Sequence, residues 1–360
     1  MLGRTRRLAV LAEGSFTATD AKTAVGVLRY RPEEVVAVID STRAGRTAQS
    51  CAGVGGDIPV VANLEAAAAF EPDGLLLGTA PQGGALPASW RSLVAEALMR
   101  GWDVLSGLHV LLADDPELAT LAASKGCSIL DVRRAPLSRP LAARRAAELD
   151  ALVVLTVGSD CNTGKMTTAL QLRAELVKKG VRTAFVATGQ TGIFVADRGV
   201  AIDAVPGDFA AGVVEQLVCD AALEADIVLV EGQGALHHPA YSGVSLSLLH
   251  GACPDTLILC HQVGRTHMRI ADSGPAPRIK SLSELVRDQE RAASWMSPAR
   301  VLGISLNTMT VNEVEGRRAV EHAEQLTGLP VVDPVRFGAE PIASALLRRM
   351  EERRRNAASA

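Results

Sequence analysis

Aromatic residues are scarce in this chain of 360 residues: only 3% are Phe, Trp or Tyr, although 48% are hydrophobic. The cores are therefore expected to be built from Ala, Val and Leu. No apolar run reaches the length that a membrane span requires. A net charge of −3 gives no general attraction to nucleic acid or to an acidic membrane. We therefore expect no nucleic-acid partner and no membrane association.

The six cysteines include no CxxC pair, the spacing that would indicate a zinc site. Their scatter also argues against a disulfide framework and for a reducing compartment. The first apolar stretch ends at Glu13, which makes it too short for a signal sequence. We therefore expect a cytoplasmic protein, and we expect it to be a homo-oligomer that acts on a small molecule.

Short apolar, β-rich stretches alternate with helical patterns along the whole chain. This alternation predicts α/β folding with parallel, doubly wound sheets. We expect a Rossmann-like domain at 1–134, a linker at 135–150 and a P-loop NTPase-like domain at 151–360. The predicted strands are 8–12, 35–39, 59–61, 74–78, 104–106, 128–132, 152–157, 183–188, 227–230, 256–260, 301–306 and 330–332.

The first domain lacks the GxGxxG turn of dinucleotide-binding folds, since its first turn reads Glu13-Gly14-Ser15-Phe16-Thr17-Ala18. Asp40 ends the second strand, where a ribose-binding acid would lie, but a Rossmann-like fold without a dinucleotide remains the better interpretation. Ligands of such sheets bind at the carboxyl ends of the strands. The groups expected there are Lys22, Arg29, Asp40, Gly83, Gly84 and His109, of which His109 is a candidate substrate ligand.

The strongest motif joins an apolar strand to a helix through a glycine-containing turn and a lysine. Strand, glycine loop, lysine and helix in this order predict a phosphate-binding loop, in which backbone amides and the helix N-terminus face an anion. The residues expected to bind phosphate or cofactor are Gly158, Ser159, Asp160, Cys161, Asn162, Thr163, Gly164, Lys165, Met166 and Thr167.

Two departures from the usual motif limit what the loop can do. Its first glycine lies one position early, at Gly158, and Met166 replaces the Ser or Thr whose hydroxyl binds Mg²⁺. Thr167 is the nearest hydroxyl, but one helical step rotates it by about 100°. The sequence thus predicts phosphate binding more firmly than nucleotide hydrolysis.

Polar residues at the ends of later strands complete the expected site. Glu231 ends an apolar strand in the Walker B arrangement, and with Asp208 and Thr167 it would bind Mg²⁺ if that ion is used. His237 or His238 could act as general base, and Glu231 is a further catalytic candidate. Asn307 is expected to bind cofactor, or alternatively to form a turn. The expected substrate ligands here are Gln190, Arg265, His267 and Arg269.

Several of these motifs together resemble a bacterial and archaeal family of two-domain proteins, with a Rossmann-like domain followed by a phosphate-loop domain. The pieces that carry the resemblance are 21–24, 28–30, 80–84, 106–109, 131–134, 158–168 and 231–234. The second half is also similar to dethiobiotin synthetase, through Gly158, Gly164-Lys165, Glu231 to Gly234 and Asn307.

The family includes D-glutamate N-acetyltransferases, so the resemblance implies acyl transfer from acetyl-CoA or another acyl-CoA to an acidic amino acid. In that hypothesis Lys165 and the loop amides bind the phosphates of CoA, and Arg265 or Arg269 binds a carboxylate. The alternative is a ligase that uses ATP with Mg²⁺ to activate a carboxylate. The third hypothesis, a nucleotide-sensing regulatory protein, finds least support because no basic groove or extra binding module is evident.

Overall fold

The computed structural model describes residues 5–79, 86–196, 198–270 and 275–358, and the chain divides into two compact units. Unit 1 contains Met1–Ala135 and Gly189–Ala204, and unit 2 contains Pro136–Thr188 and Val205–Ala360. The chain therefore passes between the units three times. A division of the sequence at one linker would place 189–204 with the second domain, whereas the compact units place this segment with the first.

Unit 1 is built on a six-stranded parallel sheet with the order β3-β2-β1-β4-β5-β6. This is the doubly wound order expected from the alternating sequence pattern, and it reverses direction at β1. Each predicted strand of this half is present, with ends that differ from the predicted ones by at most one residue. The strands are β1 (Leu8–Leu11), β2 (Val35–Ile39), β3 (Val60–Val61), β4 (Gly74–Leu77), β5 (Asp103–Ser106) and β6 (Ile129–Asp131).

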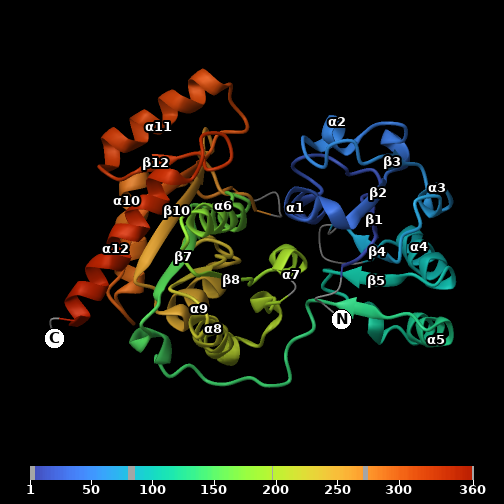
Figure 1. The fold of residues 1–360 in the computed structure, drawn as a ribbon, viewed down its shortest axis with the longest axis horizontal. Helices are drawn as coiled ribbons and strands as arrows, with labels where there is room; N and C mark the ends of the chain where they lie inside the picture. The colour runs from blue at the N-terminus through green and yellow to red at the C-terminus, as the bar shows by residue number, and fades with distance from the viewer. Residues whose placement is uncertain (1–4, 80–85, 197, 271–274, 359–360) are drawn as a thin grey trace. The chain divides into compact units, whose positions relative to one another are not determined.

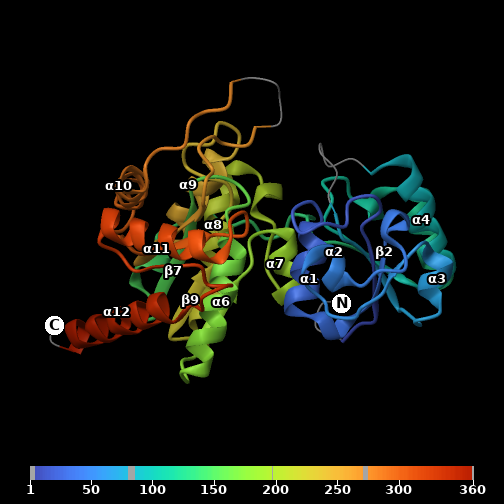
Figure 2. The same ribbon diagram turned by 90° about the horizontal axis from the view of Figure 1, so that it is seen from above.

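Helices cover both faces of this sheet. α4 packs between α3 and α5, while α1 lies beside α7 (Figures 1 and 2). The α1–α7 contact includes a buried hydrogen bond of 3.0 Å between the hydroxyls of Thr23 and Thr191. The helices are α1 (Lys22–Tyr30), α2 (Ala48–Ala52), α3 (Leu64–Ala68), α4 (Ala88–Met99), α5 (Pro116–Lys125) and α7 (Gln190–Ala196), and the short 3₁₀ helices are η1 (Pro32–Glu34), η2 (Ser41–Arg43), η3 (Leu112–Asp114) and η5 (Ile202–Ala204).

The start of α1 is not capped by Thr19 or Asp20, although both are residue types that often cap helices and lie just before it. The N-cap residue is Ala21, and no side chain caps the helix. Thr17 explains this, because its hydroxyl donates to Asp20 and accepts from the Asp20 amide, which holds these residues in a separate turn.

Unit 2 is built on a second six-stranded parallel sheet, with the order β12-β11-β10-β7-β9-β8. β7 carries the phosphate-loop motif at its carboxyl end and lies between β9 and β10, at the point where the strand order reverses. Loops after adjacent strands at such a point form the ligand crevice of α/β sheets. The strands are β7 (Leu152–Gly158), β8 (Thr183–Val186), β9 (Ile227–Val230), β10 (Thr256–Gln262), β11 (Arg300–Asn307) and β12 (Val331–Val332).

The helices of unit 2 form two layers on this sheet. α6 and α12 contact each other on one face, and α8, α9 and α10 contact one another in turn on the other, with α11 next to α10 and β12 (Figure 1). The helices are α6 (Lys165–Lys178), α8 (Gly207–Ala222), α9 (Ser242–Ala252), α10 (Leu282–Ala293), α11 (Glu313–Thr327) and α12 (Glu340–Ala358), with the 3₁₀ helix η4 (Arg145–Glu148) before β7.

Much of the predicted linker is anchored to unit 2 rather than free. The buried carboxylate of Glu215 on α8 accepts hydrogen bonds from the amides of Ala143 and Arg145 and from the Arg145 guanidinium, at 2.7–3.0 Å. Gly212, one turn earlier, lets the backbone of Pro140 approach so closely that a Cβ atom would lie 1.9 Å from its carbonyl oxygen. Only residues 136–139 therefore remain as an extended connection.

Within the described residues, no helix combines the length and the apolar character needed to cross a membrane.

Candidate phosphate-loop site

The turn between β7 and α6 has the conformation that a phosphate loop requires. Asn162 and Gly164 both adopt positive φ angles, of 56° and 105°, just before α6 begins at Lys165. Gly158 is needed for close packing, because a Cβ there would lie 2.7 Å from the Lys165 Nζ and 2.9 Å from the Thr163 hydroxyl. The early glycine of the motif thus makes room for the lysine to fold over the loop.

Lys165 and Thr163 hold the loop closed through one backbone oxygen. The carbonyl of Asp160 accepts a 2.8 Å hydrogen bond from Lys165 Nζ and a 3.2 Å bond from the Thr163 hydroxyl. The lysine side chain is buried, so its charge faces the inside of the turn. A cation beside a helix N-terminus is an arrangement that favours the binding of an anion.

The Asp160 carboxylate, which is fully buried, joins this loop to the segment after β10. One oxygen accepts from the Cys161 amide at 2.7 Å, and the other from the Arg269 amide and the Arg265 guanidinium at 2.9 and 3.1 Å. Arg265 also donates to the Cys161 carbonyl at 2.6 Å. Arg265 therefore stabilises the loop rather than presenting a free cation, whereas the Arg269 side chain is exposed.

His261 is a member of the site that the sequence analysis missed. It lies on β10, and its Nδ1 is 2.8 Å from the hydroxyl of Ser159, which is fully buried. Burial, assisted by the charge of Arg265, lowers the pKa of His261 to about 4. The imidazole is therefore neutral at pH 7. A histidine near the end of a predicted strand beside the phosphate-loop strand was the signal that could have identified it.

Glu231 directly follows β9, as predicted, but its carboxylate already accepts a hydrogen bond within the protein. It accepts a 3.0 Å hydrogen bond from the Thr188 amide, and its carbonyl accepts from the Thr188 hydroxyl at 2.6 Å. The next residue, Gly232, approaches β7 so closely that a Cβ would lie 1.7 Å from the Thr156 carbonyl oxygen. The contacts of Glu231 and Gly232 therefore hold the carboxyl ends of β8, β9 and β7 together.

The remaining magnesium candidates are not gathered around Glu231. Asp208 is exposed in the first turn of α8, and Thr167 is partly exposed in the first turn of α6. Among the residues that the structure describes, the one cluster of three His, Cys, Asp or Glu with metal-like spacing is Asp160, Cys161 and His238. The hydrogen bonds of Asp160 and His238 already use those ligand atoms, so the cluster supports the loop rather than favouring a metal.

The two adjacent histidines after β9 have different surroundings. His238 is buried, its Nε2 bonds the Arg269 carbonyl at 2.8 Å, and its Nδ1 accepts from the Ala240 amide at 3.2 Å. With both ring nitrogens engaged, His238 fits a structural role better than that of a base. His237 bonds Asp288 through Nε2 at 2.9 Å, and its Nδ1 has no hydrogen-bond partner among the residues that the structure describes.

The other predicted ligands of unit 2 lie in the segment after β10, at the end of β11 and in α6. His267 is exposed and contacts the Thr266 hydroxyl at 3.0 Å. Asn307 ends β11, and its side-chain oxygen accepts from the Met309 amide at 3.1 Å, which is the turn-forming role. Met166 is buried in the first turn of α6, where the motif usually has a hydroxyl.

Gln190 and His109 belong to unit 1. Gln190 accepts a 2.8 Å hydrogen bond from Arg133, a buried residue that also bonds the Gly107 carbonyl and pairs with Asp203. Burial, followed by the charge of Arg133, lowers the pKa of His109. These groups form a polar cluster inside unit 1, so the structure groups Gln190 with His109 rather than with the phosphate loop.

Asp40 lies where a dinucleotide-binding fold would have its ribose-binding acid, and its carboxylate is hydrogen-bonded within unit 1. The carboxylate of Asp40 accepts from the amides of Gly14 and Phe16 at 3.2 and 3.0 Å, and from the Thr42 hydroxyl at 2.6 Å. It therefore organises the turn after β1. Gly83 and Gly84 lie outside the described residues.

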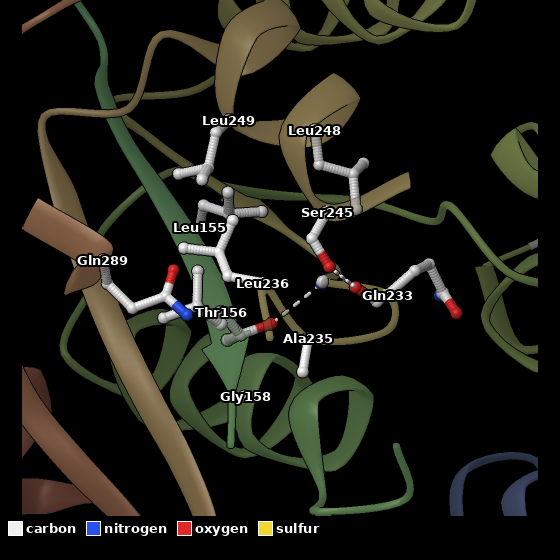
Figure 3. Close-up of a pocket in the computed structure, with 12 residues that line it drawn as sticks. Leu155, Thr156, Gly158, Gln233, Ala235, Leu236, Ser245, Leu248, Leu249 and Gln289 are labelled. Atoms are coloured by element: carbon white, nitrogen blue, oxygen red, sulfur yellow. Dashed lines mark hydrogen bonds between the residues drawn. The ribbon is translucent and has the colours of Figure 1, made fainter. Parts of the chain in front are cut away.

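A small cavity lies directly behind the phosphate-loop strand. Figure 3 shows Thr156, Leu236, Ser245 and Gln289 converging on it. Its volume is about 10 Å³, and the buried side-chain oxygen of Gln289 has no hydrogen-bond partner within the described part of the chain. The space suits one water molecule, which would satisfy this oxygen.

Comparison with known proteins places this geometry in a family. Residues 140–343 match the P-loop domain described as DUF1611_C, and residues 41–135 match the Rossmann-like domain described as DUF1611_N, both domains of unknown function. The chain belongs to the DUF1611 family. A DUF1611 protein from Anabaena variabilis has a crystal structure with a TM-score of 0.91 and 39% identity, which covers 95% of this chain and 99% of that one.

Two relatives of this DUF1611 chain carry functional names. A protein of Tritonibacter scottomollicae named D-glutamate N-acetyltransferase is 38% identical over 330 residues, which cover 91% of this chain and 94% of the relative. A protein of a Pseudoalteromonas species with the same name is 40% identical over 272 residues, which cover 75% of this chain and 80% of the relative.

Proposed function

We propose that this protein is an acetyl-CoA-dependent N-acetyltransferase whose acceptor is D-glutamate. The observation that carries the proposal is the pair of relatives with that name, at 38% and 40% identity, one of which aligns with 91% of the chain. We retain a cytoplasmic location and a homo-oligomeric state as parts of the proposal, and light scattering on the purified protein would test the second.

The phosphates of CoA are assigned to the phosphate loop in this proposal. The loop supplies backbone amides, the N-terminus of α6 and the charge of Lys165, which together suit a diphosphate. Met166 supports CoA rather than ATP, because Mg²⁺ prefers oxygen ligands and a thioether is soft. A transferase needs only to bind the diphosphate, whereas a nucleotidase must also coordinate a metal ion for cleavage.

The acceptor is an anion with two carboxylates, and the segment after β10 offers cations for it. Arg265 is committed to Asp160 and to the Cys161 carbonyl, which leaves the exposed Arg269 as the better candidate ligand. The exposed His267 lies two residues before it. An arginine suits this role because its planar guanidinium binds carboxylates in a bidentate manner.

The proposal is tested by incubating the protein with acetyl-CoA and D-glutamate and measuring N-acetyl-D-glutamate and free CoA thiol. L-glutamate, D-aspartate and acetyl-CoA alone serve as parallel controls. The proposal predicts one thiol released per N-acetyl-D-glutamate formed. Failure to acetylate D-glutamate with any acyl-CoA would contradict it.

The ligase hypothesis retains one specific observation in its favour, the carboxylate of Glu231 at the end of the strand next to the phosphate loop. In that hypothesis Glu231, with Asp208 or Thr167, would bind Mg²⁺, and ATP would activate a carboxylate. It predicts ADP release that depends on Mg²⁺ and falls sharply in Glu231→Gln. The acetyltransferase proposal predicts no ADP.

A further inference from the structure

The segment between β10 and α10 contains a short antiparallel ribbon. Two backbone hydrogen bonds, donated by the amides of Met268 and Ile279 at 2.9 and 2.8 Å, flank the bridged pair His267 and Arg278. In an antiparallel pair of this kind the two Cα atoms are about 4.5 Å apart, and the two side chains leave the same face. His267 and Arg278 are therefore direct neighbours on one face of the ribbon.

The two faces of this ribbon differ in burial. Met268 and Ile279 are only 4% and 8% exposed, so their face packs against the body of unit 2. Side chains alternate between the faces of an extended strand, which places His267, Arg269 and Arg278 on the outer face. All three are exposed. The outer face of the ribbon is therefore a basic surface open to solvent.

The positive charge of the ribbon is only partly neutralised. The described stretches 263–270 and 275–280 contain four Lys or Arg residues and no Asp or Glu. Arg265 and Lys280 are paired with carboxylates of unit 2, at 3.1 and 2.6 Å. Arg269 and Arg278 have no carboxylate partner among the residues that the structure describes. Such a surface attracts an anionic ligand.

The ribbon is attached directly to the phosphate loop. The Arg269 amide donates to the Asp160 carboxylate at 2.9 Å, and the pairing places the Cα atom of Arg278 within about 8 Å of that amide. Burial, followed by the charge of Arg269, lowers the pKa of Arg265, whose guanidinium bonds the Cys161 carbonyl at 2.6 Å. The outer face therefore adjoins the loop.

The chemistry of CoA supplies a second anionic group at a suitable position. CoA and ATP share an adenosine and a diphosphate, so a phosphate loop alone does not distinguish them. CoA also carries a phosphate monoester on the ribose 3′ oxygen, and one ribose separates this group from the diphosphate. A cationic surface next to the loop can therefore recognise the group that ATP and ADP lack.

We propose that Arg278, together with His267, binds the 3′-phosphate of CoA and so selects CoA over adenine nucleotides. The inference rests on the proposed function and names the residues that recognise its cofactor. The planar guanidinium of Arg278 suits bidentate contact with a phosphate, and the imidazole of His267 adds an N–H donor. Arg269, nearer to the loop, contributes its charge to the same field.

The test compares CoA with 3′-dephospho-CoA by calorimetry on the full-length protein. We expect the parent to bind CoA about tenfold more tightly, and this preference to shrink at high salt because the residues are exposed. Arg278→Ala should reduce the preference to less than about threefold without changing the affinity for 3′-dephospho-CoA. Arg278→Lys keeps a point charge and should retain part of the preference, as should His267→Ala.

The matched control is Arg318→Ala, which removes an exposed arginine of α11 and should leave the preference unchanged. If the parent acetylates D-glutamate but binds both ligands equally, or if Arg278→Ala keeps the tenfold preference, this inference is wrong and the proposed function stands. If the parent transfers no acetyl group to D-glutamate, the proposed function fails, and the calorimetric preference alone then decides the 3′-phosphate assignment.

Discussion

At the scale of single residues, the phosphate loop is held by side chains that bond its own backbone. Lys165 illustrates this, since it begins α6 and its Nζ donates a hydrogen bond to the Asp160 carbonyl. We expect Lys165→Ala to weaken acetyl-CoA binding by about 10- to 100-fold, because a charge-assisted hydrogen bond contributes about 1.5–3 kcal/mol. Calorimetry measures this effect, and Lys178→Ala, an exposed lysine at the end of the same helix, is the control. Equal affinities of the two variants would contradict the assignment.

Met166 gives a second prediction at this scale. Met166→Thr restores the hydroxyl that Mg²⁺-dependent loops use. Because the proposed transfer needs no metal, acetylation by this variant should stay within about threefold of the parent, with or without Mg²⁺. Steady-state assays in both conditions measure it. A large gain that requires Mg²⁺ would favour the ligase hypothesis instead.

His261 predicts a pH dependence of stability. An unfolded histidine titrates near 6.5, whereas His261 in the fold titrates near 4. Between these values the unfolded chain binds the additional proton, so the free energy of unfolding falls as pH decreases through this window. The loss between pH 7 and 4.5 amounts to about 2 kcal/mol. Urea unfolding at both pH values should show a correspondingly smaller loss in His261→Gln, and an identical loss would contradict the prediction.

The sequence predicted the loop residues at this scale because they are contiguous and their motif is a local pattern. It did not predict His261 as the partner of Ser159 or Asp288 as the partner of His237, because each pair joins segments far apart in the chain. For the same reason Arg265 looked like a substrate ligand. Only the fold reveals that its guanidinium already donates a hydrogen bond to the Asp160 carboxylate.

At the scale of elements, close backbone approaches determine how segments dock. The anchored segment before β7 touches α8 at Gly212, where a Cβ would lie 1.9 Å from the Pro140 carbonyl oxygen. We expect Gly212→Ala to lower the free energy of unfolding by about 2 kcal/mol or more, because backbone must move. Gly207→Ala, at the start of the same helix with nothing within 4 Å, should change it by less than about 0.5 kcal/mol. Similar stabilities of the two variants in urea unfolding would contradict this account of the contact.

The strands were the most predictable elements, since buried parallel strands read as continuous apolar runs such as Leu152 to Val157. Short helices were less predictable. The α7 helix spans only Gln190–Ala196, and this length is too short for a clear helical period. Its membership in unit 1 follows from packing against α1, which no local pattern records.

At the scale of the whole molecule, the chain passes from one unit to the other and back. Gly189–Ala204 belongs to unit 1 but is covalently flanked by unit 2. Leu137 is fully exposed, so limited chymotryptic digestion should cut there before it cuts at Leu149, which is partly buried and whose carbonyl accepts a hydrogen bond from Arg353. The two pieces should then co-elute in gel filtration and separate only in denaturant, because α7 remains packed on the N-terminal piece. Separation under native conditions would contradict this division.

The central claim concerns the whole protein: a phosphate loop here serves acyl transfer and not nucleotide cleavage. The most direct measurement incubates the purified protein with acetyl-CoA, D-glutamate and ATP, with Mg²⁺ or with EDTA, and quantifies N-acetyl-D-glutamate and ADP together. The account predicts that N-acetyl-D-glutamate forms at the same rate in EDTA and that no ADP appears. Product formation that requires both Mg²⁺ and ATP, with equivalent ADP, would contradict it.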